Sequence, residues 1–232
     1  MIVNTDEYKY KIELHAHSKP VSECSDIPPE ELVETYKELG YNAVVLTNHF
    51  QPVQFEKADK KSAVERYLND FYKAKSEGEK IGLSVLLGME IRFVDSKNDY
   101  LVYGLDVDDV LKAADYVNID IGTFYKEFKN EKNVILQAHP FRNGMTLAPK
   151  KSLDGIEVFN FHPNHNSRIG FAAKYAKENG YIIAGGSDFH HEGQAGQCSM
   201  LSKTNPKDSF DIASILKSGD YLFDIWGCKI II

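Results

Sequence analysis

Histidine and carboxylate side chains recur at the ends of apolar, β-branched runs along this 232-residue chain. The five segments, in chain order, are Glu13-Leu14-His15-Ala16-His17, Thr47-Asn48-His49, Gly88-Met89-Glu90, Ala138-His139-Pro140 and Gly186-Ser187-Asp188-Phe189-His190. Such apolar runs are typical of strands, so imidazole and carboxylate groups would gather where successive strands end. These groups are ligands of divalent transition metals. The pattern therefore predicts a metal site.

Strand geometry explains the two paired elements. Side chains at positions i and i+2 of an extended segment point to the same side, so His15 and His17 can reach one ion, and Asp188 and His190 can do the same. The candidate metal ligands are His15, His17, His49, Glu90, His139, Asp188 and His190. They exceed what one tetrahedral ion needs, so we expect two or three divalent metal ions (Zn, Mn or Fe) with Glu90 as the bridge.

The ordered segments resemble the polymerase and histidinol phosphatase (PHP) domain family over about residues 10 to 192. Further matching segments are Pro29-Glu30-Glu31-Leu32-Val33 and Gly155-Ile156-Glu157-Val158-Phe159-Asn160. The resemblance implies a single-domain distorted (β/α)7 TIM-like barrel with the metal site at the C-terminal face of the strands. It also implies a metal-dependent phosphoesterase in which Glu90 and His190 are catalytic.

By the same resemblance, His15, His17, Glu90 and Asp188 would hold one ion, Glu90 and His139 a second, and His49 and His190 a third. Two positions depart from common family patterns. Many relatives have another histidine after the Glu90 segment, where Asp99 or a water would complete the shell here. In the loop after His17, the residues that could bind are Glu23, Cys24 and Asp26.

Four further residues are candidates for substrate and phosphate binding. Arg142 and Arg168 could grip a phosphate through a bidentate guanidinium fork, although a surface ion pair is the alternative for each. His162 and His165 lie in the loop after the sixth expected strand, near the same face. Substrate contact and an ordinary loop or helix-capping role are both open for them.

Alternating strand and helix patterns position these residues. We predict strands near 10–16, 42–48, 83–91, 99–104, 133–138, 155–160 and 181–186, and helices near 28–39, 61–76, 108–114, 120–131 and 166–179. This βα alternation indicates an α/β protein with a mainly parallel sheet and one domain over residues 1–232, although a doubly wound open sheet would give the same pattern. After a helix at 207–217 and a strand at 221–225, the apolar end Lys229-Ile230-Ile231-Ile232 is expected to be buried, with an oligomer interface as the alternative.

Composition restricts the partners. Hydrophobic residues make up 43% and charged residues 26%, enough for a packed core. No apolar stretch approaches the length of a membrane span and the start lacks a signal-peptide core, so we expect a cytoplasmic protein with no membrane contact. The three cysteines show no disulfide or C-x-x-C pattern, and a net charge of −7 argues against broad nucleic-acid binding. A small phosphorylated substrate stays compatible because bound cations would reverse the local potential.

The leading hypothesis is a phosphoesterase that hydrolyses a phosphate ester by attack of metal-bound hydroxide, since no serine or cysteine nucleophile motif is found. One alternative is a metal-binding regulatory or interaction module without catalysis. Another is an amidohydrolase-like C–N hydrolase, whose barrels also use H-x-H and a late Asp. The substrate, the number and identity of the metals and the oligomeric state are left open.

Overall fold

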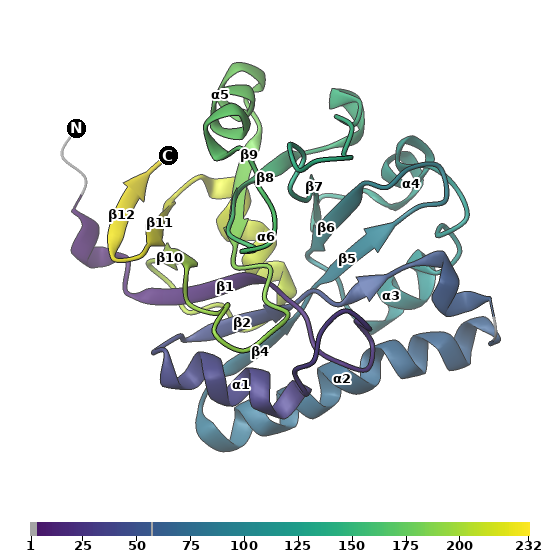
Figure 1. Cartoon of the computed structure of the whole chain (residues 1–232), viewed down its shortest axis with the longest axis horizontal. Helices are drawn as coiled ribbons and strands as arrows, with labels where there is room; N and C mark the ends of the chain where they lie inside the picture. The colour runs from purple at the N-terminus through teal and green to yellow at the C-terminus, as the bar shows by residue number, and fades with distance from the viewer. Residues whose placement is uncertain (1–3, 57) are drawn as a thin grey trace.

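The strands of this protein are divided between two six-stranded sheets in a computed structural model that describes residues 4–56 and 58–232 (Figure 1). The first sheet has the order β12-β11-β10-β1-β2-β4 and the second has the order β3-β5-β6-β7-β8-β9. The strands of the first sheet are β1 (Tyr10–Ala16), β2 (Ala43–Leu46), β4 (Ser84–Leu87), β10 (Cys198–Ser202), β11 (Tyr221–Ile225) and β12 (Cys228–Ile231). Those of the second are β3 (His49–Phe50), β5 (Met89–Arg92), β6 (Asp99–Tyr103), β7 (Val134–Gln137), β8 (Gly155–Asn160) and β9 (Ile182–Gly186).

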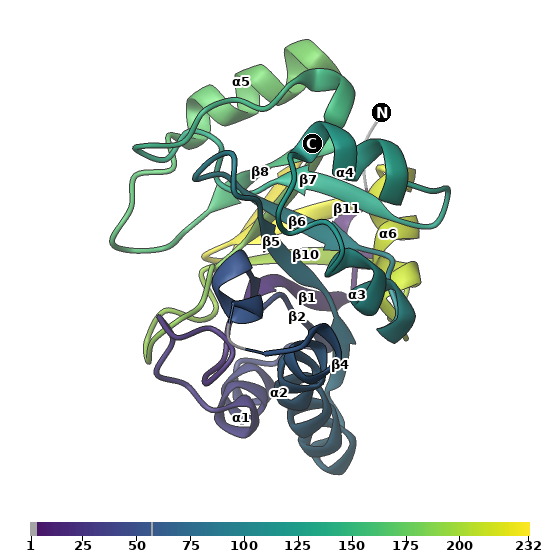
Figure 2. The same ribbon diagram turned by 90° about the vertical axis from the view of Figure 1, so that its right-hand side faces the viewer.

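Helices cover the outer faces of the sheets. Figures 1 and 2 show α1 (Pro29–Glu38) and α2 (Lys60–Ile81) side by side beneath β1, β2 and β4. The helix α2 begins at Asp59, whose side chain accepts a hydrogen bond from the backbone of Ser62, and ends at Gly82 in the left-handed conformation. The other helices are α3 (Val107–Ala113), α4 (Ile121–Phe128), α5 (Ile169–Asn179) and α6 (Ser209–Ser218). None of the described helices is long and apolar enough to cross a bilayer.

The two sheets meet where β1 and β9 end. The backbone N–H of His17 donates to the carbonyl of Phe189 over 3.0 Å, and Ala16 forms an isolated parallel bridge with the same residue. Close approach requires a glycine at position 186, because a Cβ there would lie 2.6 Å from both the Glu13 carboxylate and the Cβ of His15. This junction brings the ends of the first and ninth strands into one site.

The mixed α/β class is confirmed. The described strands form two sheets without a closed barrel, so the distorted (β/α)7 TIM-like barrel is not confirmed. The expectation of a mainly parallel sheet was wrong. Five strand pairings are parallel and five are antiparallel. The expected burial of the apolar end was also wrong: Ile231 and Ile232 are 58% and 44% exposed, since β12 is an edge strand paired only with β11.

Candidate metal centre

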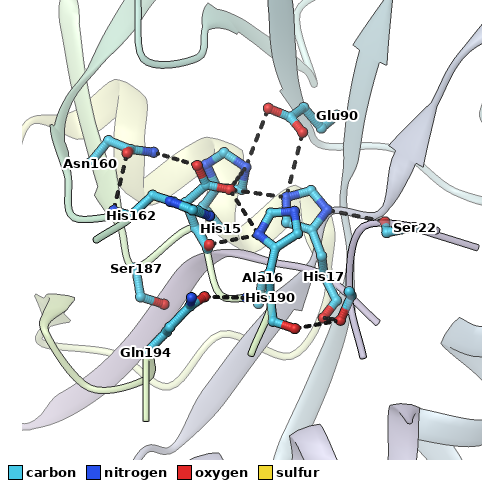
Figure 3. Close-up of polar contacts among 12 residues, drawn as sticks. His15, Ala16, His17, Ser22, Glu90, Asn160, His162, Ser187, His190 and Gln194 are labelled. Carbon is cyan, nitrogen blue, oxygen red and sulfur yellow. Dashed lines mark hydrogen bonds and ion pairs between the residues drawn. The ribbon is translucent and has the colours of Figure 1, made fainter. Parts of the chain in front are cut away.

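Glu90, on β5, is the centre of a cluster of imidazoles. Its carboxylate oxygens lie 2.7 Å from His49 Nδ1, 3.2 Å from His139 Nε2, and 3.4 Å from the Nε2 atoms of both His15 and His17. The side chains of Glu90, His15 and His17 are at most 1% exposed. Figure 3 shows Glu90 facing the rings of His15, on β1, and His17, just after it. One carboxylate that contacts four imidazoles is suited to bridge metal ions.

Asp188 contacts the same two rings. Its Oδ1 atom lies 3.4 Å from the Nε2 atoms of both His15 and His17. Asp188 has φ 54° and His139 has φ 30°, left-handed values that non-glycine residues rarely adopt. Such strained backbone is held in place by its surroundings and concentrates at functional sites.

The orphaned nitrogens of the cluster fit a metal. His15 Nε2 and His17 Nε2 are buried without a hydrogen-bond partner. Buried polar atoms without partners are costly unless an ion or water satisfies them. Among the described residues, three groups have ligand atoms within 4.8 Å of one another: His15, His17 and Asp188; His17, His49 and His190; and His49, Glu90 and Asp99.

Glu157, on β8, fixes the orientation of His15. Its Oε1 atom accepts a hydrogen bond from His15 Nδ1 over 2.8 Å, so the Nε2 lone pair faces the cluster. Its Oε2 atom accepts from the backbone N–H of His139 and from Asn160 Nδ2, each over 3.0 Å. Glu157 therefore supports ligands from two different strands, a role that the sequence pattern did not predict.

Glu13 is another supporting residue that the sequence analysis missed. Its fully buried carboxylate accepts hydrogen bonds from the backbone of His15 over 2.9 Å, from the backbone of Ser187 over 3.0 Å, from Ser187 Oγ over 2.7 Å and from Tyr36 Oη over 3.1 Å. Burial outweighs these hydrogen bonds and raises the pKa of Glu13 to about 7. The signal for such residues is a Glu between two aliphatic residues of a strand, Ile12-Glu13-Leu14 in β1 and Ile156-Glu157-Val158 in β8.

The remaining imidazoles are oriented by nearby oxygens. His190 Nδ1 lies 2.8 Å from the backbone carbonyl of Asp188, to which it donates, and this leaves Nε2 as the free nitrogen. His17 Nδ1 lies 3.2 Å from Ser22 Oγ, and Ser22 is itself hydrogen-bonded to Asn48 over 2.9 Å. Each ring thus presents its other nitrogen to the cluster, as metal-binding histidines do.

Charges in the cluster shift the pKa values of its members. Burial alone lowers the pKa of His15, but the carboxylates of Glu157, Asp188 and Glu90 outweigh it and raise that pKa well above its ordinary value. Burial also opposes protonation of His49, yet the adjacent Glu90 raises its pKa to about 10. Without metal, these protonated rings balance the buried carboxylates.

Asp99 lies in the cluster, as the sequence analysis allowed. It is 2% exposed, and its Oδ2 atom lies 3.9 Å from His139 Nε2. Arg92 binds both carboxylate oxygens over 2.7 Å, an arrangement that fixes the side chain beside Glu90.

The two arginine candidates differ in position. Arg142 reaches the cluster, where its Nη2 atom lies 2.5 Å from Asp188 Oδ2 and 3.0 Å from Asn160 Oδ1. Arg168 does not reach it. Its guanidinium is exposed and donates to the carbonyl of Phe141 and to Asn143 Oδ1, so it holds the loop that carries Arg142.

The loop after His17 brings one of its three candidates to the site. Burial raises the pKa of the Cys24 thiol, but hydrogen bonds with His190 and His49 outweigh it and lower the pKa to about 6. Glu23 is exposed and lines a separate cavity of 640 Å³. Asp26 is exposed and pairs with His191 over 3.1 Å, away from the described ligand groups.

The two loop histidines follow β8. His162 is 8% exposed, and its ring lies 5.3 Å from that of His190. Burial is the main reason that its pKa falls to about 4. His165 is exposed, with its ring 4.7 Å from that of His162. Both therefore border the cluster without belonging to it.

A cluster of five imidazoles and three carboxylates in a mixed α/β fold defines the class of this protein as a candidate metal-dependent hydrolase. The model of the PHP domain family matches residues 13–220, and the chain belongs to this family. A search of curated proteins found no match.

Three solved structures are similar in fold. A two-domain protein from Bacteroides vulgatus, described as containing a PHP-like metal-dependent phosphoesterase, is 18% identical with a TM-score of 0.68, over 97% of this chain and 67% of that one. A protein from Bifidobacterium adolescentis, described as a metal-dependent phosphoesterase, is 18% identical with a TM-score of 0.53, over 89% and 95% of the two chains. An amidohydrolase from Chromobacterium violaceum is 14% identical with a TM-score of 0.56, over 79% and 88%.

Proposed function

We propose that this protein is a metal-dependent phosphoesterase that hydrolyses a small phosphate ester. The observation that carries the proposal is the convergence of His15, His17, His49 and His139 on Glu90, with buried ring nitrogens left unpartnered beside Asp188. When bound, divalent ions supply positive charge for phosphoryl oxygens and acidify a water that can attack phosphorus.

The chain provides ligands for more than one ion. One ion would be held by His15, His17, Glu90 and Asp188, and a second by Glu90 and His139 together with Asp99. A third would be held by His49 and His190, which the structure groups with His17. Glu90 belongs to the first two shells, so its carboxylate would keep neighbouring ions at a fixed separation.

Arg142 supplies the group that selects a phosphate. Its guanidinium projects into the cluster, and its Nε atom is buried without a hydrogen-bond partner. A planar guanidinium with a free donor can bind a phosphoryl oxygen without losing its contact with Asp188. A neutral amide substrate would give this cation no anionic partner, so Arg142 favours phosphate esters over C–N substrates.

The proposal is tested by hydrolysis in metal-reconstituted protein of phosphomonoesters, phosphodiesters and cyclic amides, with Glu90→Gln and His190→Ala beside the wild type. We expect phosphomonoester hydrolysis in the wild type, and loss of most of the rate in both variants. His191→Ala is the matched control, because His191 is the adjacent histidine and pairs with Asp26 outside the cluster.

Hydrolysis in heavy-oxygen water tests the mechanism separately. If water attacks phosphorus directly, the released phosphate carries one oxygen from the solvent and no phosphorylated protein accumulates. Activity that survives both chelation and Glu90→Gln would refute the phosphoesterase assignment and favour a metal-binding module.

A further inference from the structure

A second hollow borders the candidate metal centre. It has a volume of 470 Å³, and four of its lining residues carry aromatic rings: Phe161, His162, His165 and Trp226. We refer to these four residues as the ring cluster. Among the described residues that line the hollow, none is acidic and Arg168 is the one with a permanent charge. Its environment therefore suits a neutral, flat group better than a cation.

The hollow is continuous with the metal centre. Asn160 lines it and also donates through Nδ2 to Asp188 Oδ2 over 3.1 Å. His162 lines it and lies 5.3 Å, ring to ring, from His190. Figure 3 shows Asn160 and His162 beside the histidines of the cluster. This hollow therefore adjoins the position where a phosphate would bind.

Trp226 lies at the rim of the hollow, at a turn position where a tryptophan is unusual. It occupies the turn between β11 and β12 with φ 50°, followed by Gly227 with φ 84°, a two-residue hairpin turn in which asparagine before glycine is strongly favoured. A bulky residue is disfavoured there, and Trp226 is also 67% exposed. Its ring contacts Phe161 edge to face, with the centroids 4.8 Å apart. Neither turn geometry nor burial explains a tryptophan at this position.

We propose that the ring cluster is the subsite for the organic part of the substrate, and that it takes a flat aromatic ring, either an aryl or a purine group. The inference rests on the proposed function, because the phosphoryl group must be held at the metal centre for the ring to lie between Trp226 and His162. Asn166 and Gln197 also line the hollow and offer amide groups to the edge of a ring that carries nitrogen atoms.

Binding to the metal-loaded protein tests this proposal without turnover. Benzylphosphonate, cyclohexylmethylphosphonate, methylphosphonate and inorganic phosphate are titrated while the emission of Trp226, the one tryptophan of the chain, is recorded. We expect benzylphosphonate to change the emission and to bind about tenfold more tightly than the non-aromatic phosphonates, the size of effect that ring stacking gives. Equal binding of all three phosphonates, with unchanged emission, overturns the subsite and leaves the proposed function standing. If neither inorganic phosphate nor any phosphonate binds, the subsite and the proposed function are both overturned.

Variants locate the effect. Trp226→Asn keeps a residue that the turn favours, so folding is preserved while the ring is removed. We expect the ratio of kcat/KM for phenyl phosphate to that for glycerol 3-phosphate to fall about tenfold in this variant and to be largely restored in Trp226→Phe. Phe171→Ala is the matched control, because Phe171 is an equally exposed aromatic residue that does not line the hollow. An unchanged ratio in Trp226→Asn would overturn the proposal. Adenosine 5′-phosphate in place of phenyl phosphate shows whether the favoured ring is purine or aryl.

Discussion

Replacing Glu157 by glutamine should weaken metal binding although Glu157 is not itself a ligand. Its two oxygens accept three hydrogen bonds, from His15 Nδ1, from the His139 backbone and from Asn160. A glutamine has one carbonyl oxygen, which accepts, and one NH2 group, which donates. If the NH2 group faces His15, the Nδ1 atom must accept, and the proton moves to Nε2, where it blocks the metal-facing lone pair. If the NH2 group instead takes the place of Oε2, it faces the backbone N–H of His139 and the Nδ2 group of Asn160, which are both donors.

Either arrangement leaves a mismatch beside a ligand. Loss of such a supporting carboxylate typically lowers metal affinity by about 10- to 100-fold, or about 1.4 to 2.7 kcal/mol. The assay is competition between the protein and a chelating dye for Zn²⁺ at pH 7.5. Denaturation of the metal-free variant is measured in parallel, because buried donors facing each other also lower the free energy of unfolding, by about 1 to 3 kcal/mol.

Glu178→Gln is the control, since Glu178 on α5 is 60% exposed and pairs only with Lys174 in the described structure. It should leave Zn²⁺ affinity unchanged. If Glu157→Gln binds Zn²⁺ within twofold of the wild type, His15 does not depend on this carboxylate for its orientation. The assignment of the Nε2 lone pair to the metal would then be refuted.

Three further predictions follow from the charges of the centre. In metal-free protein, Cys24 should react with iodoacetamide at a rate that rises through about pH 6, because its pKa is lowered to that value. A midpoint for Cys24 near about 8.5, the value of an unperturbed thiol, would contradict the contacts described. Zn²⁺ loading at pH 7 should release protons, because the raised pKa values of His15 and His49 keep both rings protonated until a metal displaces the proton. The release is measured with a pH indicator in weak buffer. The protons released by His49 should disappear above about pH 10, where this ring is already neutral. Asp188→Asn should lower the Zn²⁺ content measured by elemental analysis, and an unchanged content would remove Asp188 from the ligand set.

The convergence of the candidate ligands was expected from strand geometry, and their role as metal ligands stays a prediction. Side chains two apart on an extended segment share a side, which brought His15 and His17 together. Glu90 approaches them from the other sheet, where it is paired with His49 across β3 and β5. Their partition among ions stays a prediction. The supporting carboxylates could not be predicted in this way, because Glu157 contacts His15 across 142 positions of sequence.

The sheet topology could not be predicted from the sequence for a related reason. The pairings of β10 with β1 and β11 join segments that no local pattern connects, and they convert an expected parallel arrangement into a mixed one. The apolar end shows the same limit. Hydrophobic composition predicted burial for Ile231, but its strand lies at the edge of the sheet, where no further strand is paired with it in the described structure.

The carboxylates of the centre are neutralised by cations of two kinds, and the difference has a functional consequence. His49 neutralises Glu90 only while it is protonated, so a metal bound at this ring would displace that charge. Arg92 holds Asp99 with a guanidinium that does not lose its proton, so the carboxylate keeps its partner throughout.

Arg142 is also a permanently charged guanidinium, but its partner is Asp188, a carboxylate that would also bind a metal. Once an ion neutralises Asp188, the charge of Arg142 is no longer balanced within the protein. The guanidinium then attracts an anion to the position next to the ion, in a buried site where charges interact strongly. Metal binding would therefore create the phosphate site as well as the catalytic one, so phosphate should bind far more weakly to the metal-free protein than to the loaded one.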